Sequence, residues 1–501
     1  MEGTSQVERI TVVTPSYEAK EVRFHGDRSP MAEPLLTQEA PPRIGELPPT
    51  TKEFHRHTLL AAGANLAKAI LGVGILALPR VFAMLGIGTA SIFLAFVAIL
   101  TYASLHLLTK ATARTGLTTY SDVVYQHLGL VGQVFLDLAV VVNCFGLMMV
   151  YMIVIGDVLV GDSHGNEGLL SAACGDRRIV LAVVTLLVLA PMLSARNVRS
   201  ATAASALGVT AIVIWAVVSL LLFGVAWSNG QVHHMNWWPH GQVVKGGGFE
   251  KVVQVAATLP IIVVAFICQM ALHPALRGVA YLREAHINSV NTVALSLSAA
   301  AFLLISVSCY GVFGGKGIEA DVLRNFTVDA LQPLVWTEVA QAGFMTVRLA
   351  FLISLLATFP LQMTPFRDSL WKLLFRQELQ ARTASLNRHL RLSGWQTADR
   401  DVCKGPGFWL VTYLSLVCVY LAASAITSIW EPLMIIGSTA GVLVAFVFPG
   451  ALGMAMGEEL TESTTSRTSR GITGAVLIIV GIVIGLAGII RVIAYNDPLA
   501  G

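Results

Sequence analysis

Eleven long apolar runs constrain this chain more than any other feature of its sequence. Each run has about 20 residues or more, the length that an α-helix needs to cross the hydrocarbon core of a bilayer. Backbone polar groups find no water in that core, so runs of this kind cross it as helices. The sequence therefore predicts an all-α integral membrane protein with eleven transmembrane helices, near residues 55–86, 88–113, 130–160, 177–194, 203–227, 251–280, 288–314, 341–366, 406–429, 431–455 and 471–495.

Composition agrees with a membrane protein and excludes several other classes. Hydrophobic residues make up 55% of the 501 residues and charged residues only 13%, far from the composition of a soluble domain. A formal net charge of +3 gives no reason to expect a nucleic-acid partner. The sequence lacks the HExxH and GxGD motifs of membrane-bound hydrolases, so we do not expect an enzyme.

Two regions differ in character. Residues 1–53 are polar, with prolines and mixed charge, and are expected to form a disordered cytosolic tail. Residues 54–501 form the predicted transmembrane domain. Most of the 33 lysines and arginines lie in the tail and in alternate loops, above all in the loop after the eighth helix. The positive-inside rule then places the amino terminus in the cytosol and the carboxyl terminus on the opposite side. The short amphipathic segment 118–128 is expected at the membrane interface.

The first apolar run contains an interruption. The segment Asn65–Arg80 reads NLAKAILGVGILALPR, with Gly72 and Gly74 two residues apart and Pro79 further on. Glycine holds a helix interior poorly, so the backbone can unwind here. An unwound stretch inside a membrane is tolerated only where it is buried in protein or lines a cavity. Such stretches mark the binding sites of transporters.

The sixth run shows a second interruption. Pro260 and Pro274 flank Cys268-Gln269, and the pair His273-Pro274 is expected to stop a regular helix from the carboxyl side. The first and sixth helices enter the membrane from opposite sides and lie five helices apart. Two five-helix units of opposite topology, each beginning with a broken helix, indicate an inverted repeat, followed here by one extra helix.

Several motifs of these helices resemble a known family. They are AKAILGVGILALP in helix 1, VVNCFGLMMVYMIVIGDVL in helix 3, AFICQ in helix 6, ATFPLQMTPFR in helix 8 and GSTAGVLVAFVFP in helix 10. Together they resemble the amino acid/auxin permease superfamily, in particular the plant vacuolar-type amino-acid transporters and the animal sodium-coupled neutral amino-acid transporters. The likeness covers about residues 55–455. It implies a LeuT-like fold and secondary transport of amino acids.

An amino acid offers one carboxylate and one ammonium, and the two breaks suit both. Free amides at the start of a half-helix bind a carboxylate, helped by the positive end of the helix. Carbonyl oxygens freed at the other break suit the ammonium. The alternative is that the glycines serve close helix packing, and Asn143 can equally form a hydrogen bond between helices. The expected substrate-binding residues are Gly72, Val73 and Gly74 in helix 1, Asn143 in helix 3, and Ile267, Cys268 and Gln269 in helix 6.

Lys68 and Thr358 are the expected ion-coupling residues. In the sodium-coupled relatives, the resemblance places a sodium-ligating asparagine at Lys68 and a threonine ligand at Thr358. An ammonium group there would repel Na⁺, and a lysine held away from water can exchange a proton. An ionisable group inside a span is functional by default. Alternatively, Lys68 extends to the cytosolic interface.

The sequence thus predicts a secondary active transporter for amino acids, with neutral ones favoured, that is Na⁺-independent and proton-coupled. An amino-acid sensor of the same fold and a Na⁺-coupled symporter remain the alternatives. We expect no cofactor beyond the coupling proton or Na⁺, an amino acid and membrane lipid as partners, and a multi-pass location in either a vacuolar or the plasma membrane. The oligomeric state stays open. The sequon at Asn325 is a possible glycosylation site on the non-cytosolic side.

Overall fold

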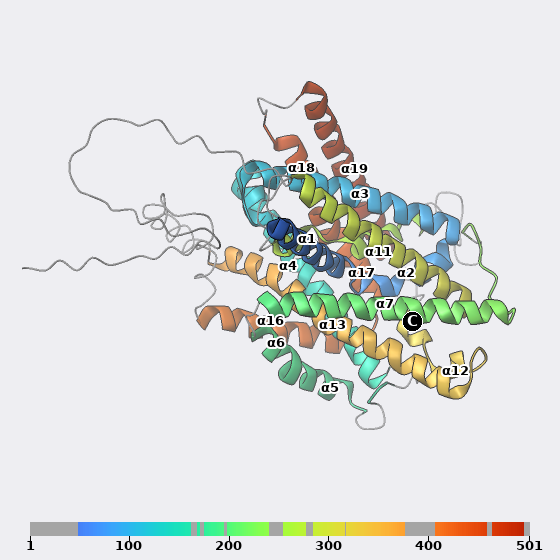
Figure 1. Cartoon of the computed structure of the whole chain (residues 1–501). Coiled ribbons are helices and arrows are strands. Elements are labelled where there is room, and N and C mark those ends of the chain that lie inside the picture. The colour runs from blue at the N-terminus through green and yellow to red at the C-terminus, as the bar shows by residue number, and fades with distance from the viewer. Residues whose placement is uncertain are drawn as a thin grey trace, which may run out of the picture. The chain divides into compact units, whose positions relative to one another are not determined.

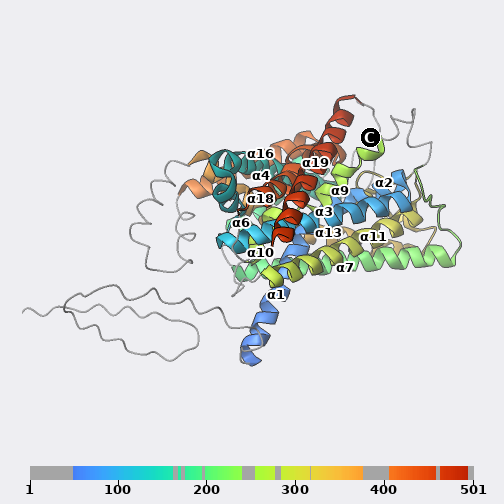
Figure 2. The same ribbon diagram turned by 90° about the horizontal axis from the view of Figure 1, so that it is seen from above.

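The structure is a computed structural model. It describes residues 49–161, 168–170, 175–194, 198–239, 254–276, 284–315, 317–375, 406–457 and 463–494, and within these ranges the chain is almost entirely helical. Most of the expected tail and of the loop after the eighth helix lie outside the described residues. Figures 1 and 2 show long helices, among them α3, α7 and α11, running roughly along a common direction.

The helices have the following bounds. In chain order they are α1 (Pro49–Ile70) and α2 (Gly74–Leu85); α3 (Ile87–Thr115); α4 (Tyr120–Val160); α5 (Arg177–Val184), η2 (Thr185–Leu189) and α6 (Ala190–Ser194); α7 (Val198–Ser228); α9 (Leu259–Phe266) and α10 (Gln269–Leu276); α11 (Glu284–Phe313); η3 (Val322–Asn325) and α12 (Val328–Leu331); α13 (Thr337–Leu374); α16 (Pro406–Ala425); α17 (Trp430–Ile436), η5 (Gly437–Gly441), η6 (Leu443–Val447) and α18 (Phe448–Ala455); and α19 (Thr464–Ala494).

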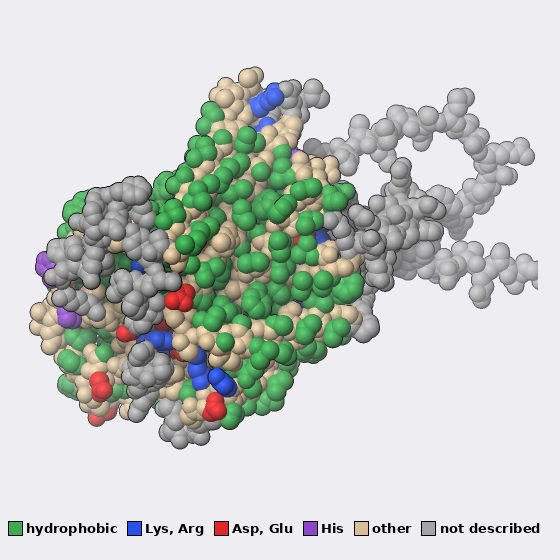
Figure 3. Space-filling model, turned by 180° about the vertical axis from the view of Figure 1, so that it is seen from behind, with side chains coloured by type: hydrophobic (Ala, Val, Ile, Leu, Met, Phe, Trp, Pro, Cys, Tyr) green, Lys and Arg blue, Asp and Glu red, His purple; other side chains and the backbone are tan. Residues whose placement is uncertain are grey.

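These helices make up the eleven spans that the sequence predicts. In the described residues, ten helical stretches are long and apolar enough to cross a membrane, and a bent pair adds an eleventh. That pair is the first span: residues 59–70 and 74–85 meet at 57°. Hydrophobic side chains cover most of the face shown in Figure 3, as expected for helices surrounded by lipid. We number the spans one to eleven in chain order.

The first span breaks where its glycines predict. Helix α1 ends at Ile70 and α2 begins at Gly74. Between them the Gly72 amide donates to the Ile70 carbonyl at 2.7 Å, across two residues where a helix spans four. The expectation of a free amide at Gly72 is therefore wrong, because the backbone turns tightly enough for this amide to meet a carbonyl of α1. The Leu76 amide donates to the Val73 carbonyl at 3.0 Å, whereas the Gly74 and Ile75 amides have no helical turn before them to supply an acceptor. Pro79 lies inside α2 and does not end it.

The sixth span breaks one residue before Cys268. Helix α9 ends at Phe266, Ile267 is extended with φ −66° and ψ 111°, and α10 begins at Gln269. Pro260 stands in the first turn of α9, where a missing amide costs nothing. The expectation that His273-Pro274 stops the helix is wrong, because α10 runs through Pro274 to Leu276. Proline at this sixth position of α10 removes the amide that would donate to the Met270 carbonyl, and the helix continues for two residues beyond it.

Two further irregularities shape the bundle. The predicted interfacial segment is helical from Tyr120, and Gly129, with φ 69°, turns it into the third span. The tenth span contains two wide, π-helical stretches, η5 and η6. Stretches of this kind are uncommon and occur mostly at functional sites.

Exposed tryptophans gather at one end of the spans. Trp227, Trp237, Trp238 and Trp336 are each more than 60% exposed. They lie at the end of the fifth span, in the segment after it and just before the eighth span. All these positions are on the predicted non-cytosolic side. Tryptophan concentrates at the boundary between lipid and water, so these residues mark that boundary.

Candidate functional site

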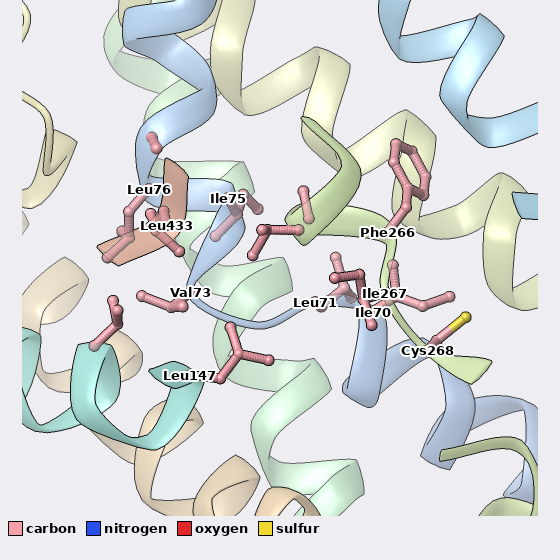
Figure 4. Packing of buried hydrophobic residues seen from close by; sticks show 14 of the residues in the cluster. Ile70, Leu71, Val73, Ile75, Leu76, Leu147, Phe266, Ile267, Cys268 and Leu433 are labelled. Atoms are coloured by element: carbon pink, nitrogen blue, oxygen red, sulfur yellow. The ribbon is translucent and has the colours of Figure 1, made fainter. Parts of the chain in front are cut away.

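The two breaks lie side by side in the middle of the bundle. Helix α2 packs on α9 and α1 packs on α10. Figure 4 shows the non-helical stretch around Leu71 and Val73 close to the one at Ile267 and Cys268. All four of these residues are buried. The tertiary structure thus brings together the two segments that the sequence singles out.

Gly72 faces Tyr151 of the third span. A Cβ added to Gly72 would lie 3.1 Å from the Tyr151 hydroxyl oxygen. Tyr151 is 1% exposed, and its ring lies against that of Phe359 with centroids 6.4 Å apart. The break therefore has a phenolic hydroxyl directly beside it.

Gly74 serves a different purpose. A Cβ there would lie 2.6 Å from Cα and 2.9 Å from Cβ of Ala265 on α9. Real Cβ atoms do not approach backbone so closely, so Gly74 allows α2 and α9 to touch. The packing explanation therefore accounts for Gly74. It does not account for Gly72, whose nearest neighbour is a hydroxyl group.

Asn143 leaves a buried polar atom without a partner. Its side chain is fully buried, and its Nδ2 donates only a long bond of 3.7 Å to Sδ of Met270 on α10. Its Oδ1 has no hydrogen-bond partner among the described residues. Buried polar atoms are nearly always satisfied, and leaving one without a partner costs about 1–3 kcal/mol. The contact with Met270 puts Asn143 next to the break of the sixth span.

The sixth-span break is partly satisfied by its own residues. The Cys268 amide donates to Oε1 of Gln269 at 3.1 Å, and the Cys268 carbonyl accepts the Ala271 amide at 2.9 Å. The expected free carbonyl at Cys268 therefore already has one donor. A carbonyl oxygen has two lone pairs, so one remains for a ligand.

Lys68 lies deep in the protein, away from the cytosolic interface that the alternative requires. It is fully buried, and its Nζ donates to Oγ of Ser354 at 2.8 Å and to the Leu71 carbonyl at 3.2 Å. Thr358, one helical turn after Ser354 on α13, donates instead to the Ser354 carbonyl at 2.7 Å. Lys68 thus connects the first break to the eighth span.

Ser354 is the residue that sequence reasoning missed. It lies four residues before Thr358 and so faces the same side of α13. That spacing was visible in the sequence, but a serine inside an apolar helix is common, and nothing in the sequence ties it to Lys68. Gly208 on α7 was missed as well. A Cβ there would lie 2.8 Å from Cδ of Lys68 and nearer still to its Cε, so the glycine makes room for the lysine.

A separate charged cluster lies at the predicted non-cytosolic end. Asp157 of α4 pairs at 2.9 Å with both Arg177 of α5 and Arg324 of η3. Burial, together with the nearby Asp157 charge, raises the pKa of the Asp321 carboxyl from 3.8 to about 7, although Arg324 opposes the shift. Arg348 of the eighth span also lies close enough to lower the pKa of Asp321.

The sequon residue is engaged in the fold. Asn325 Nδ2, the atom that would carry a glycan, donates to the Gly317 carbonyl, and its Oδ1 accepts the Glu319 amide at 2.9 Å. Glycosylation at Asn325 stays a prediction, and it requires this turn to rearrange.

Sequence comparison finds relatives along nearly the whole chain. The family model described as transmembrane amino acid transporter protein matches residues 55–494. The chain is 26% identical to the amino acid transporter AVT6C of Arabidopsis thaliana, over 88% of this chain and 94% of that protein. It is 28% identical to AVT6A of the same plant, with 89% and 90% covered. It is 22% identical to vacuolar amino acid transporter 6 of Saccharomyces cerevisiae, with 86% and 98% covered.

Comparison with solved structures identifies the fold. The manganese transporter of Eremococcus coleocola superposes with a TM-score of 0.52 at 15% identity, over 91% of both chains. At this identity the likeness concerns the fold alone. Together with the two broken spans, it confirms the LeuT-like architecture expected from the sequence.

Proposed function

Because the chain belongs to the family of transmembrane amino acid transporter proteins, we propose that it moves amino acids across a membrane and binds them at its two broken spans. The protein is an integral, multi-pass membrane protein. The names of its relatives, which are amino acid transporters of plant and yeast, support the class of substrate. Binding at the breaks, the preference for neutral substrates and the coupling ion are inferred from geometry below.

The substrate carboxylate would bind at the start of α2. The Gly74 and Ile75 amides after the first break lack intrahelical acceptors, and the positive end of the helix dipole points toward them. The Tyr151 hydroxyl lies beside Gly72 and can donate a further bond to the same carboxylate. This arrangement provides the charge-assisted hydrogen bonds that hold carboxylates at helix amino termini.

The single observation that carries the proposal is the partnerless Oδ1 of Asn143. It is a buried acceptor that lies next to the sixth-span break and is bonded by no described residue. A substrate ammonium would satisfy it, together with the second lone pair of the Cys268 carbonyl. The residues of the two breaks, 71–74 and 267–268, are all uncharged, which favours neutral amino acids.

The coupling ion follows from Lys68. Its ammonium takes the Ser354 hydroxyl and the Leu71 carbonyl, two oxygens of the kind that would ligate Na⁺. Two unit charges about 4 Å apart repel by roughly 4 kcal/mol at an effective dielectric constant of 20, close to a thousandfold in affinity. Na⁺ binding at this place is therefore strongly disfavoured. A lysine that gains and loses a proton here would link transport to the proton gradient instead.

The substrate site is tested by replacing Asn143. In purified protein reconstituted into vesicles, Asn143→Leu should raise the KM for neutral amino acids by roughly 10- to 150-fold, because a hydrogen bond to a charged group contributes about 1.5–3 kcal/mol. The exposed Asn229→Leu variant is the control and should keep the wild-type KM. An unchanged KM in Asn143→Leu would place the substrate elsewhere. Saturable binding without accumulation would favour a sensor over a transporter.

The coupling ion is tested in the same vesicles with Na⁺ and pH gradients imposed separately. Wild-type uptake should respond to the pH gradient and not to Na⁺. Lys68→Asn should lose the response to pH. Uptake by the wild type that rises steeply with Na⁺ at constant pH would overturn the assignment of Lys68.

A further inference from the structure

Gln269 makes hydrogen bonds in two opposite directions at the break of the sixth span. Its side chain is fully buried. Oε1 accepts the backbone amide of Cys268 at 3.1 Å, and Nε2 donates to Oγ of Ser104 on α3 and to the carbonyl of Ala445, both at 3.2 Å. One amide side chain thus connects the sixth, second and tenth spans.

The carbonyl that receives these bonds belongs to the wide stretch η6. Ala445 also accepts a short bond from the Ser104 hydroxyl, and the neighbouring Val444 carbonyl accepts the Tyr120 hydroxyl at 3.1 Å. In a regular α-helix each carbonyl is taken by an amide one turn later. A wide turn disturbs that pattern and lets side-chain donors enter. The break in the sixth span and the irregular part of the tenth span therefore satisfy each other through Gln269.

We propose that Gln269 is a positioning residue for the substrate site. Its amide fixes the Cys268 backbone amide to the tenth span. Because a peptide group is planar, this sets the direction of the Ile267 carbonyl in the same group, one of the carbonyls at the break that the substrate ammonium would meet. This inference rests on the proposed function, in which the breaks hold the substrate.

Only an amide of this length meets both demands at once. The Cys268 amide requires an acceptor, and the Ala445 carbonyl requires a donor. An apolar residue would leave both buried groups without this partner, which is unfavourable. A carboxylate would accept the Cys268 amide, but its second oxygen would face the Ala445 carbonyl, and two acceptors cannot form a hydrogen bond with each other. Glutamine supplies one acceptor and one donor at the two ends of the same rigid group.

The first test replaces Gln269 with leucine, which has a similar size and no polar atoms. In reconstituted vesicles, Gln269→Leu should raise the KM for a neutral amino acid at least tenfold. A merely structural role would lower the number of active molecules, and hence the maximal rate, without changing KM. The control is Gln341→Leu, which changes an exposed glutamine on α13 and should behave as the wild type.

The second test, Gln269→Glu, gives a signature that only the positioning role explains. The ionised carboxyl of this variant has no proton to donate to Ala445. The protonated carboxyl has a carbonyl oxygen for Cys268 and a hydroxyl for Ala445, which restores the original pattern. The ratio of the variant KM to the wild-type KM should therefore fall toward one as the pH is lowered. A ratio that stays constant with pH, or a KM equal to that of the wild type at every pH, would overturn the proposal.

Ser104→Ala separates the bonds of the cluster and serves if Gln269→Leu does not reach the membrane. It removes one donor to Ala445 and one acceptor of Gln269, and it leaves the bond between Gln269 and Ala445 in place. We expect a KM change of less than threefold alone, and little additional change in a Gln269→Glu background, because residues of one hydrogen-bond network do not act additively. Fully additive effects would contradict a shared network.

The outcomes also separate this inference from the function on which it rests. If Asn143→Leu raises KM and the Gln269 variants do not, the substrate site stands and the positioning role fails. If the wild-type protein shows no saturable amino-acid uptake, the proposed function itself fails.

Discussion

Gly208 offers a test of the Lys68 site that leaves Lys68 itself in place. A Cβ at Gly208 would lie 2.8 Å from Cδ of Lys68. Carbon atoms prefer about 3.5–4.0 Å, so in Gly208→Ala the lysine must retreat by roughly 0.7 Å or more. It has no room to move closer to Ser354, because 2.8 Å is already the length of a short hydrogen bond. The bond between Lys68 and Ser354 should therefore be lost.

The size of the effect follows from the kind of bond. A hydrogen bond to a charged group contributes about 1.5–3 kcal/mol, so uptake driven by a pH gradient should fall by roughly one to two orders of magnitude. The helix itself should not suffer, since alanine favours a helix interior over glycine by about 1 kcal/mol. The matched control is Gly224→Ala on the same helix, where an added Cβ meets nothing within 4 Å.

The assay is uptake of a radiolabelled neutral amino acid into reconstituted vesicles, with the amount of protein measured in each preparation. Gly224→Ala should match the wild type. In a Lys68→Asn background, Gly208→Ala should add nothing, because both changes remove the same interaction. Proton-driven uptake by Gly208→Ala at the wild-type rate would show that the contacts of Lys68 do not matter for coupling, and the argument would be wrong.

Three further predictions concern other parts of the molecule. Gly72→Ala should reduce substrate affinity without loss of folded protein, because the added methyl crowds only the Tyr151 hydroxyl at 3.1 Å; equal affinity would detach Tyr151 from the site. Tags at the two termini should be accessible from opposite sides of the membrane, and accessibility from one side would contradict the predicted topology. The pKa of Asp321 is about 7 in the folded state and about 3.8 in the unfolded chain. As the pH rises from the lower value to the higher one, the folded protein therefore loses up to about 4 kcal/mol of stability through this group. Asp321→Asn should therefore raise the melting temperature relative to the wild type more at pH 8 than at pH 5, whereas the exposed control Asp329→Asn should show no such trend.

Local chemistry explains which parts of the fold were predictable. Long apolar runs have only one stable form in a bilayer, so the spans and the break after Ile70 follow from the sequence. The effect of Pro274 was not predictable in the same way. A proline removes one hydrogen bond of a helix, and whether the helix continues beyond it depends on the surrounding packing; α10 continues to Leu276.

The candidate site shows the same division. Residues near the breaks could be named because the glycines of the first span and the two prolines that flank Cys268-Gln269 are local features. Their separate roles could not be named: Gly74 contacts the backbone of Ala265, whereas Gly72 faces Tyr151. Gln269 was expected to contribute backbone, yet its side chain makes the decisive contacts, with residues far away in the chain.

The sequence by itself determined the class of protein, the number of spans and the positions of the two interruptions, because the bilayer penalises every unsatisfied backbone group and each helix must obey that constraint alone. Only the tertiary structure decided which atoms meet at the interruptions. Lys68 finds Ser354, Asn143 keeps an acceptor without a partner, and Gln269 reaches Ala445. These pairings join residues on different helices, and the rotation and depth of each helix, which set them, come from side-chain packing across the whole bundle.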